Sequence, residues 1–168
     1  TACVGEELSS VLSGVVEFSR SAAFYHGEAP FTARLERRIA ATTRLRTSHG
    51  GKWQLTQYPP GVGYSAHTDC MQGNGHRFVS ERDRHGTILM YLSDASSGLE
   101  SGATVFPSLG VSITPKRGRA LVFNSMARGA CLDASIHEAV KVAAGAKVIL
   151  QPWYYQAACD GPGPPPPG

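Results

Sequence analysis

The sequence has 168 residues, a formal net charge of +3 and 42% hydrophobic residues, which are ordinary values for a soluble globular protein. The length allows one domain with a hydrophobic core and excludes two full-sized domains. The small positive charge is no indication of nucleic-acid binding, and no apolar run approaches the roughly 18 residues needed to cross a bilayer. The sequence begins at Thr1 without a signal-like segment, so we expect that any targeting segment has been removed.

Two amphipathic helices are predicted at the N-terminal end, over residues 6–20 and 31–46. In the second segment, Leu35, Ile39 and Leu45 recur at helical spacing and lie roughly on one face. Arginines occupy the other faces of this helix. A solvated helix surface explains them better than an anionic partner does.

From residue 52 onward, short β-like runs separated by glycine and proline replace the helical pattern. The runs are KWQLTQY, GTILMYL, ATVF, VSIT, RALVF, HEAVKV and KVILQPWYY. Short strands that follow two helices predict a sandwich, jelly roll or barrel with the helices packed on one side.

Two further segments are predicted to lie outside regular structure. Residues 70–85 are polar and contain glycine, which indicates a mobile loop near a site. The C-terminal GPGPPPPG cannot join a helix or a sheet and should form polyproline II. We therefore divide the chain into one domain, residues 1–158, and a Pro-rich tail, residues 159–168.

The four cysteines are Cys3, Cys70, Cys131 and Cys159. None of them forms a CxxC pair, which excludes a zinc finger or a thioredoxin-type motif. An even count allows two disulfides in any of three pairings, but free buried thiols are an equal alternative. The redox compartment is therefore left open.

A candidate metal site is formed by two histidines and one carboxylate. His67 and Asp69 stand at i and i+2, so in an extended strand both side chains point to the same face. This HxD pair alone is a weak signal, because such tripeptides arise by chance. His137, at the start of a later β-like run, would complete a facial triad of the kind that leaves coordination positions open on Fe(II).

Lys147 begins the next β-like run and is a candidate cation for an organic acid bound beside the metal. Its alternative is an ordinary surface lysine. Zinc is the rival metal for such a set of ligands, but the HExxH helix of many zinc hydrolases is absent from the sequence. The other four histidines stand in polar or Gly-rich surroundings and are predicted to be surface residues.

Several segments occur in the order and at the spacing seen in prolyl 4-hydroxylases, a family that the chain resembles over about residues 20–156. These segments are QYPPGVGYSAHTD, TILMYLSD, GATVFP, ITPKRGRALVF, SIHEAVKVAAGAKV and PWYY. The resemblance implies a mainly β fold, a double-stranded β-helix (jelly roll) whose N-terminal helices pack on the major sheet. It also implies Fe(II), 2-oxoglutarate and O2 as cofactor and cosubstrates, with ascorbate as reductant.

The resemblance assigns roles to further residues. Tyr58, Tyr91 and Thr104 resemble residues whose hydroxyl groups help Lys147 to bind the 2-oxoglutarate tail. The alternative is that each is an ordinary core or strand residue.

Tyr64 and Trp153 resemble residues of a peptide groove, and Arg84, in the predicted loop, is a poorer match to the same groove. Some positions depart from the family pattern, and they put a prolyl peptide substrate in doubt. These positions are Ser101, Ala103, Arg119 and Glu138, the last of which would add negative charge beside the metal.

The function implied is hydroxylation of proline in a Pro-rich polypeptide, coupled to oxidative decarboxylation of 2-oxoglutarate. One alternative keeps the cofactors but changes the substrate to a small molecule or a residue other than proline. Another is an inactive jelly-roll module that only binds Pro-rich chains. The resemblance favours the endoplasmic reticulum lumen or the secretory pathway, and the cytoplasm is an alternative.

The Pro-rich tail leads to a separate hypothesis. Pro162 and the run Pro164–Pro167 would lie as polyproline II in a groove lined by Tyr64 and Trp153, in the place of a substrate. The alternative is that the tail only packs against a neighbouring molecule.

Overall fold

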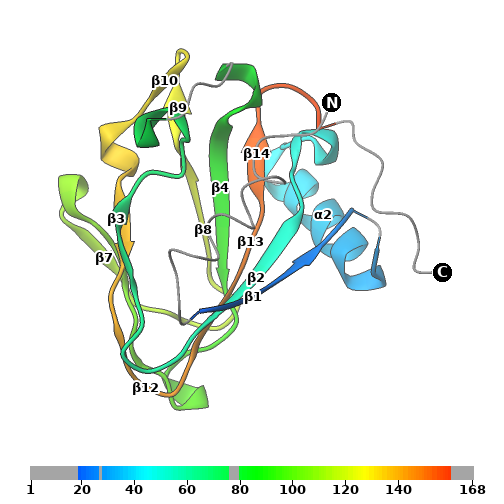
Figure 1. Cartoon of the computed structure of the whole chain (residues 1–168). Coiled ribbons are helices and arrows are strands. Elements are labelled where there is room, and N and C mark those ends of the chain that lie inside the picture. The colour runs from blue at the N-terminus through cyan, green and yellow to red at the C-terminus, as the bar shows by residue number, and fades with distance from the viewer. Residues whose placement is uncertain (1–18, 27, 76–79, 160–168) are drawn as a thin grey trace.

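Two antiparallel β-sheets face each other in the computed structural model, which describes residues 19–26, 28–75 and 80–159 (Figure 1). The major sheet contains, in spatial order, β1 (Arg20–Phe24), β2 (Trp53–Tyr58), β13 (Lys147–Gln151), β4 (Arg84–Tyr91) and β14 (Trp153–Tyr155), with β8 (Ala120–Asn124) also paired to β4. The minor sheet contains β3 (Tyr64–His67), β11 (His137–Ala139), β6 (Thr104–Phe106) and β7 (Val111–Ile113). This arrangement confirms the predicted mainly β jelly-roll fold.

Two small strand pairs complete the β structure. β12 (Val142–Ala144) pairs with β5 (Glu100–Ser101), and β10 (Ala130–Cys131) pairs with β9 (Met126–Ala127). The second pair leads directly into the segment before β11, so it lies next to the end of the minor sheet that carries His137.

One α-helix in the described part of the chain, α2 (Pro30–Thr43), covers the outer face of the major sheet (Figure 1). It begins with proline in its first turn, where the missing N–H costs nothing, and it ends at Arg44 in the left-handed conformation. Ile39 packs with Trp53, Ile88 and other buried residues of the sheet. The predicted helix over 31–46 is thus confirmed, with bounds a few residues different.

A buried polar contact also ties α2 to the sheet. The Trp53 indole N–H donates to Glu36 Oε1 at 3.1 Å, and His26 Nδ1 lies 2.7 Å from the same oxygen. His26 Nε2 is 2.7 Å from the carbonyl oxygen of Gly50. The Glu36 carboxylate on α2 therefore contacts both His26, in the connection between β1 and α2, and Trp53, the first residue of β2.

The predicted β-like runs are confirmed as strands, and two of them are divided. HEAVKV contributes to both β11 and β12, and KVILQPWYY is interrupted at Pro152 between β13 and β14. Proline has no N–H to donate to a ladder, which explains the interruption. β1 was not predicted. The predicted helix over 6–20 lies outside the described residues except at its end, where Arg20 instead begins β1. The Pro-rich residues 160–168 also lie outside them.

The predicted loop over residues 70–85 is shorter than expected, because β4 already begins at Arg84. Its described parts form two 3-10 turns, Gln72–Asn74 and Ser80–Arg82. Of the cysteine alternatives, the disulfide is correct: Cys70 is bonded to Cys131, and Cys159 is disulfide-bonded as well. Among the described helices, none has the length and apolar character needed to span a membrane.

We expect Glu36→Ala to lower the free energy of unfolding by about 1–3 kcal/mol, because the buried Trp53 N–H would lose its acceptor. Urea denaturation followed by tryptophan fluorescence measures this change. Arg37→Ala, at the adjacent exposed position of α2, is the control and should change the free energy by less than about 0.5 kcal/mol. Equal changes in the free energy of unfolding for the two substitutions would show that the Glu36 contact does not stabilise the packing of α2.

Candidate active site

The three predicted metal ligands converge at one end of the minor sheet. His67 ends β3 and His137 begins β11, and the antiparallel pairing places these two residues directly opposite each other. Asp69 follows two positions after His67 and turns to the same side. The candidate ligand atoms of the three side chains all lie within 4.8 Å of one another, which is close enough for one ion to bind all three.

A backbone carbonyl orients each imidazole. His67 Nδ1 lies 2.8 Å from the Ser65 oxygen, and His137 Nδ1 lies 2.9 Å from the Ser135 oxygen. Because a carbonyl can only accept, each Nδ1 must carry a proton, and a neutral imidazole in this orientation has its lone pair on Nε2. Hydrogen bonds of this kind are typical partners of metal-binding histidines.

The two oxygens of the Asp69 carboxylate also have different contacts. Its Oδ2 accepts a 2.5 Å hydrogen bond from the Thr87 hydroxyl, and its Oδ1 faces His67 Nε2 at 3.7 Å. Burial lowers the pKa of His67 to about 4 despite the nearby Asp69 carboxylate, so the imidazole is neutral at pH 7, as a ligand must be. Two imidazoles and a carboxylate fit Fe(II) and leave positions open, and they also fit zinc.

Aromatic side chains enclose the histidines. The rings of Phe106 and Phe123 lie 5.4 Å and 5.1 Å from the His137 ring, and the Tyr64 ring lies 4.1 Å from that of His67. The phenylalanines and Thr87 were not assigned to the site from the sequence. Their hydrophobic and hydroxyl side chains carry no site signal until the register of the sheets brings them beside the ligands.

A second polar cluster surrounds Lys147, whose side chain is 1% exposed. Lys147 Nζ donates to Thr104 Oγ1 at 3.3 Å, and the Tyr91 hydroxyl donates to the same oxygen at 2.7 Å. The ammonium lies 5.7 Å from the ring centroids of Tyr58 and Tyr91. The surface alternative for Lys147 is therefore wrong.

The Lys147 ammonium makes no ion pair with a carboxylate in the described part of the chain. Burial lowers its pKa to about 8, and burial also raises the pKa of the Tyr58 phenol. A buried ammonium without a counter-charge is costly and uncommon. Its surroundings therefore fit an anionic ligand that enters from outside the protein.

A third group of residues flanks the metal-binding end. Arg84 and Trp153 are buried, and the guanidinium carbon of Arg84 lies 3.8 Å from the Trp153 ring centroid. Arg84 Nε and Trp153 Nε1 are buried donors without a hydrogen-bond partner in the described structure. Arg84 is the first residue of β4, so its predicted position in the loop is corrected.

One cavity of about 490 Å³ joins the three groups. The predicted site residues that line it are His67, Asp69, His137, Lys147, Tyr58, Thr104, Tyr64, Trp153 and Arg84. Tyr91 is instead fully buried behind Thr104, to which it donates. Glu138 is not among the residues that line the cavity, because side chains alternate along β11 and His137 and Ala139 point inward. The charge expected beside the metal therefore faces the opposite side of the strand.

Comparison with known proteins identifies relatives over most of the chain. A family model described as the 2OG-Fe(II) oxygenase superfamily matches residues 53–155. Prolyl 4-hydroxylase subunit alpha-1 of Mus musculus is 32% identical over 158 residues, which cover 89% of this chain. The match covers 29% of that relative, so the chain spans about three tenths of its length.

Solved structures share the fold. A viral collagen prolyl hydroxylase from Paramecium Bursaria Chlorella virus-1, described as a 2OG complex, superposes with a TM-score of 0.66 at 22% identity and covers 88% of this chain and 84% of that one. A prolyl hydroxylase from Trichoplax adhaerens, in complex with a hypoxia inducible factor peptide fragment, has a TM-score of 0.59 at 20% identity and covers 82% and 63%. The resemblance predicted from the sequence is confirmed.

We expect Asp69→Asn to weaken Mn(II) binding by at least about 100-fold. Loss of a residue that only orients a ligand typically weakens metal binding by about 10–100-fold, and loss of a ligand itself should weaken it more. Titration with detection of free Mn(II) by electron paramagnetic resonance measures the dissociation constant. Glu138→Gln removes the same charge beside His137 but on the outer face, and it should leave the constant unchanged. Similar losses in both variants would indicate a general charge effect and contradict ligation by Asp69.

Proposed function

Because the chain belongs to the 2OG-Fe(II) oxygenase superfamily, we propose that it is an Fe(II)- and 2-oxoglutarate-dependent dioxygenase that hydroxylates proline residues in Pro-rich polypeptides. One observation carries the proposal. The convergent ligand atoms of His67, Asp69 and His137 share a cavity with a buried Lys147 that has no ion-pair partner among the described residues.

In this proposal His67, Asp69 and His137 hold the iron. Each offers one oriented atom, since the other polar atom is already hydrogen-bonded to Ser65, Thr87 or Ser135. Bound Fe(II), 2-oxoglutarate and O2 would supply the oxidation, in which decarboxylation to succinate and CO2 accompanies hydroxylation of a substrate C–H bond. Ascorbate would serve as the reductant that keeps the iron in its Fe(II) form.

Lys147 is proposed to bind the distal carboxylate of 2-oxoglutarate. Its ammonium is the group that a buried carboxylate needs, and the Thr104 hydroxyl beside it offers a second polar contact. Tyr91 fixes Thr104 by donating to its oxygen. Tyr58 contributes a ring against the lysine and a phenol that stays protonated, because burial raises its pKa.

Arg84, Trp153 and Tyr64 are proposed to bind the polypeptide. The unpartnered donors Arg84 Nε and Trp153 Nε1 can each donate to a peptide carbonyl. The aromatic faces of Trp153 and Tyr64 suit proline rings, and a polyproline II chain loses little conformational entropy on binding. The prolyl hydroxylases among the relatives, one of them described with a peptide, support this substrate class.

We expect Lys147→Met to weaken 2-oxoglutarate binding by about 30-fold to several thousand-fold, since the buried carboxylate would lose its counter-charge at a cost of roughly 2–5 kcal/mol. Calorimetric titration of the Mn(II)-loaded protein measures this. Lys141→Met, at an exposed position, is the matched control and should keep the original affinity. An unchanged affinity in Lys147→Met would contradict the proposal that the cosubstrate binds at this end of the cavity.

The pH dependence of the same titration should carry the signature of Lys147. Burial lowers its pKa to about 8 in the free protein, and a bound carboxylate would raise the pKa again. Binding therefore takes up a proton above pH 8, and affinity should fall about tenfold per pH unit there while staying level below it. Lys147→Met should abolish this loss of affinity above pH 8. If the variant still lost affinity there, another group would be responsible for the pH dependence.

Succinate release tests the substrate class. We expect release to be stimulated by proline-rich peptides, and Trp153→Phe should raise the KM for peptide about tenfold because it removes one buried donor and keeps a ring. Tyr154→Phe is the control, since Tyr154 packs in the cluster on the side of α2.

Three results would contradict the proposal in different ways. Stimulation by small molecules but not by peptides would change the substrate class. A protein that binds Fe(II) without any turnover would not be an enzyme of this type. A protein that binds no metal but retains proline-rich peptides would be a binding module.

A further inference from the structure

The Asp69 ligand lies beyond the strand ladder that holds His67. β3 ends at His67, and residues 68–70 belong to no strand. The sheet register that places His67 opposite His137 therefore does not by itself position Asp69. Contacts of the following residues must supply that position.

A disulfide joins the segment after Asp69 to the segment that leads into His137. Cys70 is the residue next to Asp69 and is fully buried, and its partner Cys131 ends β10, just before the turn that precedes β11. The two cysteines are separated by 61 positions in the sequence. The bond thus links the segment that carries Asp69 covalently to the segment that leads into His137.

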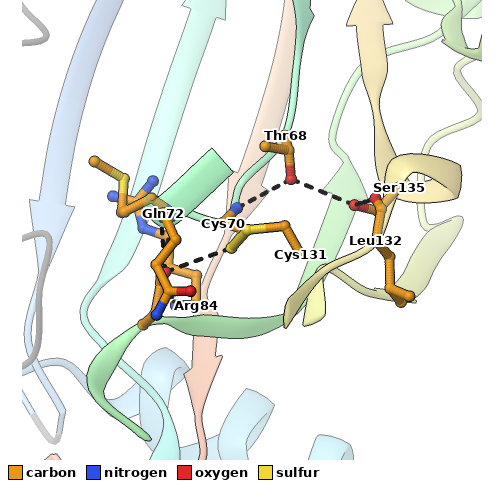
Figure 2. Close-up of a disulfide and its surroundings, with 9 residues drawn as sticks. Thr68, Cys70, Gln72, Arg84, Cys131, Leu132 and Ser135 are labelled. Atoms are coloured by element: carbon orange, nitrogen blue, oxygen red, sulfur yellow. Dashed lines mark hydrogen bonds between the residues drawn. A yellow bond between two sulfur atoms is a disulfide. The ribbon is translucent and has the colours of Figure 1, made fainter. Parts of the chain in front are cut away.

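A weaker polar link runs beside the disulfide (Figure 2). Thr68 Oγ1 lies 3.4 Å from Ser135 Oγ and accepts from the Cys70 N–H at 3.2 Å. The carbonyl of Ser135 in turn orients the His137 ring. Two hydroxyls 3.4 Å apart are at the outer limit for a hydrogen bond, so the covalent link is the stronger of the two.

The turn after Cys70 is fixed from the other side by the buried Asp83. Its carboxylate accepts from the backbone N–H groups of Met71 at 2.8 Å, Gln72 at 3.0 Å and Arg84 at 2.7 Å. Gly73 packs against the link, since a Cβ there would lie 2.7 Å from Thr68 Cγ2 and 3.3 Å from Cys131 Sγ. The turn has little room to move while both attachments are in place.

We propose that the Cys70–Cys131 disulfide is a positioning element of the metal centre, so that metal affinity depends on whether this bond is intact. The cysteines do not touch the ion; they act through Asp69 and the segment that carries His137. The inference rests on the metal site of the proposed function. Partners that orient metal ligands typically change affinity by 10–100-fold, and we expect a change of that size.

The test compares Mn(II) dissociation constants of the full chain and of Cys70→Ala/Cys131→Ala at a temperature where both are folded. We expect a rise of about 10–100-fold. Cys159→Ser removes the other disulfide and should leave the constant within about twofold, although it lowers thermal stability. A wild-type chain that binds no Mn(II) would overturn the proposed function. Wild-type binding with an unchanged constant in the double variant would overturn the positioning role alone.

Reduction of the wild-type chain tests the same coupling if the double variant fails to fold. Two electrons and two protons pass from dithiothreitol to the disulfide, which gives two thiols and the cyclic disulfide of the reagent. Thermodynamic reciprocity requires saturating Mn(II) to oppose this reduction by the same factor, where tenfold equals about 30 mV. Mass spectrometry of the alkylated cysteines should find Cys70 and Cys131 protected and Cys159 unaffected. Equal protection of all three, or none, would overturn the proposal.

Discussion

The pairing of β3 with β11 is the constraint on which the site depends. It sets His67 opposite His137, so candidate ligands far apart in the sequence meet across one rung of the minor sheet. A shift of one residue would turn either imidazole to the outer face. The jelly roll then brings the inner face of the major sheet against this rung, and Lys147 and Thr87 come from that sheet.

Two groups of residues with binding capacity for a charged ligand line the resulting cavity. At the metal-binding end, the candidate ligand atoms of His67, Asp69 and His137 lie within 4.8 Å of one another. At the Lys147 end, an ammonium is buried without a carboxylate among the described residues. A cation at the first end and an anion at the second would satisfy both groups, which supports the proposal that they form one site.

Local pattern was sufficient to predict most of the strands and the residues at their ends, because period-two alternation and proline or glycine punctuation mark each run. His137 and Lys147 were recognisable because each begins such a run, the HxD pair was recognisable from its i, i+2 spacing, and the family resemblance connected them. Thr87, Phe106 and the Cys70–Cys131 pairing were not predictable, since they depend on which strands become neighbours. β1 escaped detection because RSAAF has few residues that favour strands, and it is paired only along β2.

The buried ammonium of Lys147 has a consequence for the empty protein. Its pKa is lower in the folded chain than the 10.5 of an exposed lysine, so below pH 8 the fold carries the full cost of desolvating a charge. That cost fades as pH rises toward 10.5 and is gone above it. A neutral side chain at this position would make the unliganded fold more stable at neutral pH, so the proposed selectivity for an anion and resistance to unfolding would oppose each other at one residue.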